Sequence, residues 1–68
     1  MNIYKRQEQL QMSHACFQQV SDNFYRVDKD RMMHMSVGSV VSGEMLECYK
    51  KIVPQSARIT VWKLEDKS

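Results

Sequence analysis

The residues with the clearest potential for metal chemistry form one run, Met32-Met33-His34-Met35. Thioether and imidazole groups are suitable ligands for Cu(I), and the indole of Trp62 could cap such an ion by a cation–π contact. A strand through this run, however, would turn Met33 and Met35 to one face and His34 to the other. Two ligands on one face make a weak site. We therefore expect methionines of the core or of a binding surface, and a Met/His copper site is a distant alternative.

The other candidates for catalysis or metal binding are the second histidine and the two cysteines. His14 and Cys16 are two positions apart, and on a helix they would point to nearly opposite sides. Cys48 and His34 could meet only through the fold, and no local motif supports a catalytic triad or a zinc site. A chain of 68 residues also has difficulty enclosing a water-excluding pocket of about 300 Å³. The sequence therefore predicts no enzyme, no cofactor and no metal.

Size and composition are those of one small globular domain, residues 1–68. Hydrophobic residues make up 43% of the chain and charged residues 26%, close to the globular averages of about 45–50% and about 25%. A domain of this length buries only about 60% of the surface that its unfolded chain exposes. A partner that covers an apolar face commonly stabilises so small a core. We therefore expect a protein partner, with a homodimer as one possibility.

The sequence predicts neither a membrane segment nor a signal peptide. Apolar runs are short, such as the pair Val40-Val41, and fall far below the roughly 20 residues that cross a bilayer. Lys5 and Arg6 are followed by a glutamine-rich stretch where a signal peptide requires an apolar one. The cysteines lack the density of a disulfide scaffold. These features favour a cytoplasmic protein.

The N-terminal part of the chain has a helical pattern. Ile3, Leu10 and Phe17 recur at every seventh position, and this spacing predicts an amphipathic helix over about residues 3–20. The serine, aspartate and asparagine at 21–23 compete with a helix for its backbone hydrogen bonds. We expect the helix to end there.

Two short segments rich in β-favouring residues follow, at 23–27 and 31–37. An aspartate-containing connector separates them, so they predict a β-hairpin. In the second strand Met33, Met35 and Val37 would share one face. We expect that face to lie on the core.

Residues 42–53 have helix signals at both ends. Ser42 suits the N-cap, and Glu44 places a negative charge near the N-terminus of the helix. Two lysines stand in the last turn, and Pro54 prevents continuation. These signals predict a second amphipathic helix.

Residues 57–64 form the clearest strand of the sequence. Ile59 and Val61 would face one way and Trp62 the other, so both faces are apolar. This pattern is typical of a central strand, or of an edge strand that a partner covers.

The predicted order is helix, strand, strand, helix, strand. It favours an α+β fold with a three-stranded sheet and two helices on one face. Residues 1–2 and 65–68 are expected to be frayed.

These features together favour a small non-catalytic module that binds another protein. Methionines adapt to irregular partner surfaces, and an apolar strand edge can pair with another chain. Small proteins without catalytic residues are often regulators or inhibitors, including those of mobile elements, and size alone suggests such a role. The residues expected at the partner surface are Met32, His34, Tyr25 and Trp62.

The alternative function is nucleic-acid binding. A sheet that displays Tyr25 or Trp62 could stack unpaired bases, while basic side chains contact phosphates. The formal net charge of +2 permits this function without favouring it. The basic residues that would take part are Arg26, Arg58, Lys63, Lys50 and Lys51.

Overall fold

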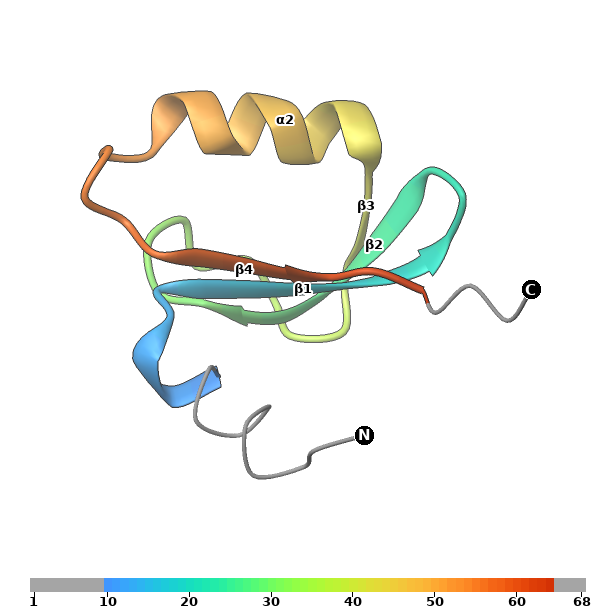
Figure 1. Cartoon of the computed structure of the whole chain (residues 1–68), viewed down its shortest axis with the longest axis horizontal. Helices are drawn as coiled ribbons and strands as arrows, with labels where there is room; N and C mark the ends of the chain where they lie inside the picture. Colours follow the sequence, from blue (N-terminus) through green and yellow to red (C-terminus); the bar gives the residue numbers. More distant parts are fainter. Residues whose placement is uncertain (1–9, 65–68) are drawn as a thin grey trace.

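The computed structural model describes residues 10–64 as a four-stranded mixed sheet with one helix, α2, packed on one of its faces (Figure 1). The strands lie in the order β3-β2-β1-β4. β1 pairs antiparallel with β2 and parallel with β4, and β2 pairs antiparallel with β3. The bounds of these elements are β1 Ala15–Ser21, β2 Phe24–Asp30, β3 Val40–Ser42, α2 Gly43–Ile52 and β4 Ile59–Trp62.

The predicted α+β class is confirmed, but the predicted arrangement differs in two respects. The sheet has four strands, not three. The helical residues 10–12 also lie on the side of the sheet away from α2, so the two helical segments do not share one face (Figure 1). On that side the Lys29 ammonium group donates to the carbonyl oxygen of Leu10 at 2.6 Å.

The predicted helix over residues 3–20 is wrong from residue 13 onward, and residues 1–9 lie outside the described part of the chain. β1 and β2 form a hairpin across the tight turn at Asp22 and Asn23. Aspartate and asparagine favour such turns because their side chains bond nearby backbone groups. β1 also pairs with β4 along its other edge, so its backbone is bonded on both sides. These hydrogen bonds to other strands favour a strand here over the helix that the seven-residue spacing predicts.

The predicted strand at 31–37 is also wrong, because Asp30 turns the chain out of the sheet. Its carboxylate accepts the backbone N–H groups of Met32 and Met33 at 2.9 Å each, and that of Met35 at 3.2 Å. Such side-chain acceptors compete with a strand ladder for the same N–H groups. His34 has a φ of 58°, in the left-handed region, which interrupts strand alternation.

The predicted helix over 42–53 is confirmed as α2. The Ser42 hydroxyl accepts the N–H of Met45 at 3.2 Å, which is the expected N-cap geometry. Leu46 and Tyr49 are buried beneath the helix. No helix in the described residues is long and apolar enough to cross a membrane.

The strand predicted at 57–64 is confirmed over Ile59–Trp62, where it forms an edge of the sheet and not its centre. Ile59 and Val61 share one face as predicted, and that face packs against the core.

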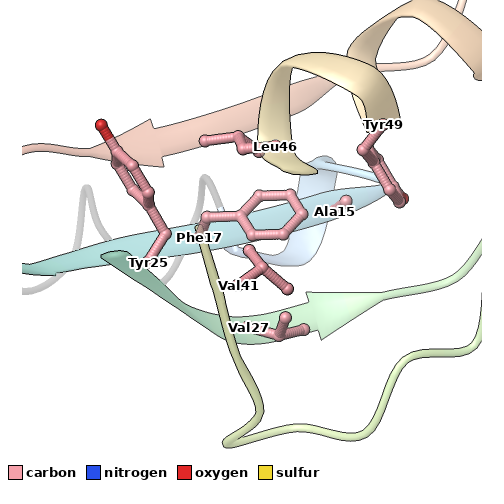
Figure 2. Close-up of a cluster of buried hydrophobic side chains, with 7 residues drawn as sticks. All are labelled: Ala15, Phe17, Tyr25, Val27, Val41, Leu46 and Tyr49. Carbon is pink, nitrogen blue, oxygen red and sulfur yellow. The ribbon is translucent and has the colours of Figure 1, made fainter. Parts of the chain in front are cut away.

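The hydrophobic core lies between the sheet and α2, and Figure 2 shows Phe17 among its side chains. Phe17 is fully buried and packs edge-to-face on Tyr49, with ring centroids 5.4 Å apart. Such pairs add about 0.5–1.5 kcal/mol beyond the area they bury. The other buried members of this cluster are Ala15, Tyr25, Val27, Val41 and Leu46.

Candidate binding groove

An apolar groove of about 390 Å³ lies between α2 and the segment that connects β2 to β3. Its inner side is formed by the buried residues Phe17, Leu46 and Tyr49. The one charged side chain that lines it is that of Glu44. We refer to this feature as the groove.

One wall of the groove is a flank of α2. Met45, Cys48 and Ile52 line this wall, and all three are exposed, Met45 to 58% and Ile52 to 64%. Positions three and four apart on a helix form one row, so these residues lie beside the core-facing Leu46 and Tyr49. The apolar sector of α2 is therefore wider than the sheet can cover.

The opposite wall consists of Met33 and Met35 from the connecting segment, with Val41 of β3. Met33 is 50% exposed, and Met35 packs partly against the core. This wall is held by Asp30, because its carboxylate bonds the backbone N–H groups of both methionines.

Asp30 also ties the two walls together. The Tyr49 hydroxyl of α2 donates to its carboxylate at 2.8 Å. Burial alone would raise the pKa of Asp30, but this bond and those from three backbone N–H groups outweigh it and lower the pKa below its ordinary value of 3.8. Burial is the largest of the causes that raise the pKa of Tyr49 well above 10. The hydrogen bond to Asp30 and the negative charge of Asp30 raise it further. The pair therefore stays a phenol donating to a carboxylate at neutral pH.

The four predicted partner-contact residues do not form one surface. Met32 packs partly against the core, and His34 is exposed. Tyr25 is only 8% exposed, on the α2 side of the sheet. Trp62 is half-buried and follows Val61 in β4, so it lies on the opposite face.

The groove uses other residues, namely Met33, Met45, Cys48 and Ile52. The sequence contains a signal for part of the groove. Met45 and Ile52 make the apolar sector of the second helix wider than packing on the sheet requires.

Of the basic residues predicted for nucleic-acid contact, Lys50 and Lys63 line a second hollow together with Tyr25, whereas Arg26 lies on the sheet face away from α2. Two of the five predicted basic residues are paired. Arg26 bonds Asp28 at 2.8 Å, and Lys50 lies 3.3 Å from Glu47. On the sheet face away from α2, however, strand register places Arg26 beside Gln18, and Gln18 beside Trp62. This face therefore has a short row that combines a cation with an indole.

The two cysteines are free and have different surroundings. Cys16 is fully buried, and burial raises the pKa of its thiol, whereas Cys48 is exposed in the groove. Among residues 10–64, no cluster of three or more His, Cys, Asp or Glu side chains could hold a metal ion.

No protein-family model, curated protein or solved structure matches this chain. Its own surfaces are therefore the basis on which a function can be assigned.

Proposed function

We propose that this protein is a small non-catalytic interaction module, acting as a regulator or inhibitor, which binds another protein through the groove. The observation that carries this proposal is the exposure of Met33, Met45 and Ile52 around one apolar hollow. Contiguous apolar surface on a small soluble domain commonly marks an interaction site. Free cysteines suit a reducing compartment, so we propose the cytoplasm as its location.

The shape and chemistry of the groove favour an amphipathic helix as its ligand. α2 has ten residues, which gives the groove wall a length of about 15 Å, or nearly three turns of a bound helix. Methionine side chains are flexible and polarizable, and they are used where a surface must fit varied apolar ligands. A small-molecule site would need several convergent polar groups, and the groove has one charged lining residue, Glu44.

Placing a charge in the groove is expected to weaken helix binding. The test selects helical peptides from a displayed amphipathic library on the wild-type protein. It then measures their affinity for Met33→Glu and Met45→Glu by fluorescence polarisation. We expect each substitution to weaken binding at least about tenfold, because a buried carboxylate would lack a partner.

Met12→Glu is the matched control, because Met12 is similarly exposed, at 54%, and does not line the groove. It should leave peptide affinity unchanged. Equal losses in all three variants would contradict the groove as the binding site. So would selection of extended peptides whose binding depends on the β4 edge.

A second candidate function, single-stranded nucleic-acid binding, is favoured by the row of Arg26, Gln18 and Trp62 across the sheet face away from α2. Aromatic and cationic side chains in one row suit base stacking with phosphate contact. If this face binds a mixed-sequence oligonucleotide, affinity should fall steeply between about 50 and 200 mM salt and be lost in Trp62→Ala. Absence of binding at about 50 mM salt would eliminate this function.

A further inference from the structure

The groove-side flank of α2 combines an apolar row with two charges of opposite sign. Met45, Cys48 and Ile52 form the row, while Glu44 and Lys51 lie along its outer edge. Neither Glu44 nor Lys51 forms an ion pair within residues 10–64. On the other flank, by contrast, Lys50 pairs with Glu47 of its own helix. The groove-side flank therefore has both uncovered apolar surface and unpaired charge.

The positions on this flank are self-complementary. Glu44 and Lys51 are seven residues apart, about two helical turns, and Cys48 lies close to their midpoint. If a second α2 lies antiparallel beside the first around a twofold axis at Cys48, Glu44 comes within one residue, about 1.5 Å along the helix, of the level of Lys51 of the other copy. Met45 likewise comes within one residue of the level of Ile52 of the other copy, and both contacts occur twice.

We propose that a second copy of this chain occupies the groove, with the two α2 helices antiparallel and the two Cys48 side chains adjacent. This inference rests on the proposed function, since it takes the groove to be a protein-binding surface. Twofold interfaces require one patch to match itself, and the charges and the apolar row meet this requirement. The antiparallel arrangement also places the acidic first turn of each helix beside the basic last turn of the other.

The size of the contact sets the strength of the dimer. One pair of ten-residue helices buries less than the roughly 1,200 Å² of standard stable complexes. The dimer is therefore weak, with a Kd on the order of 10–100 μM. Because it covers the groove, self-association and binding of another protein are mutually exclusive.

Sedimentation velocity on the full chain tests the dimer. From about 5 to 500 μM the mass should rise from monomer towards dimer. The single variants Glu44→Lys and Lys51→Glu each bring like charges together at both symmetry-related contacts of the dimer. Each should therefore raise Kd about tenfold. The double variant Glu44→Lys/Lys51→Glu re-forms both pairs and should return Kd to within about threefold of wild type.

Glu47→Lys is the matched control, because it makes the same charge change on the flank away from the groove. It should leave Kd unchanged once circular dichroism shows that the variant is folded. Mild oxidation should link wild type through Cys48, and Cys48→Ser should stay unlinked because Cys16 is buried.

Four results would overturn the proposal: a monomer throughout the concentration range, failure of the double variant to dimerise, equal weakening by Glu47→Lys, or a dimer that does not cross-link. A monomer whose groove still binds selected helical peptides would refute the homodimer and leave the proposed function intact. If the selected peptides bind Met33→Glu and Met45→Glu as tightly as wild type, the proposed function itself is refuted.

Discussion

Phe17→Ala is expected to cause the largest loss of stability, removing much or all of the free energy of unfolding. Phe17 is fully buried at the centre of the core and packs on Tyr49, so the substitution creates a cavity where sheet and helix meet. Loss of a core phenylalanine costs about 3–5 kcal/mol. A domain of this size has a free energy of unfolding of about 3–10 kcal/mol, so the loss removes much or all of it. Circular dichroism and urea titration measure the effect.

Phe24→Ala is the control for this substitution. Phe24 lies in the neighbouring strand of the same hairpin, but it is 47% exposed. It should lower the free energy of unfolding by about 1 kcal/mol or less. Comparable losses for the two variants would mean that Phe17 is not at the centre of the core.

Asp30→Ala is expected to have the second largest effect. It removes the acceptor for three backbone N–H groups and for the Tyr49 hydroxyl, which hold the methionine wall against α2. Breaking a partly buried network of this kind costs about 3 kcal/mol. Peptide binding in the groove should also weaken, even under conditions in which the variant remains folded.

Asp28→Ala is the control, since Asp28 lies in the same strand and its side chain forms the surface ion pair with Arg26. It should cause a much smaller loss of stability. If Asp28→Ala is as destabilising as Asp30→Ala, the Asp30 network does not have the structural role assigned to it.

The same network gives stability a defined pH dependence. The pKa of Asp30 is lower in the folded chain than in the unfolded chain, so the native state binds this proton less tightly. The stabilisation is therefore complete above about pH 4 and is lost as the pH falls through the native pKa. Asp30→Asn removes this contribution, so its urea midpoint should fall less than that of wild type between neutral pH and about pH 3.

Local sequence signals predicted some elements well. α2 could be placed because its cap, its end charges and Pro54 all lie within or beside it. β4 could be placed because Ile59 and Val61 alternate with Thr60 and Trp62. Both elements depend on residues that are neighbours in the chain.

The wrong predictions concern segments whose structure depends on contacts that helical spacing and strand alternation do not reveal. The helix predicted across β1 is wrong because its parallel partner β4 lies more than forty positions away, and Phe17 fits either a helical or an alternating pattern. The strand predicted at Met33 and Met35 is wrong because the nearby Asp30 side chain captures its N–H groups. The groove needs this segment and α2 side by side, which no local pattern shows.

The central claim is that the groove is the surface at which this protein binds another polypeptide. Methyl NMR of ¹³C-methionine-labelled protein tests it most directly, with a selected helical peptide as titrant. The resonances of Met33, Met35 and Met45 are expected to shift together along one binding curve, while that of Met12 stays in place. Saturable binding that moves Met12 and leaves the three groove methionines unshifted would contradict the claim.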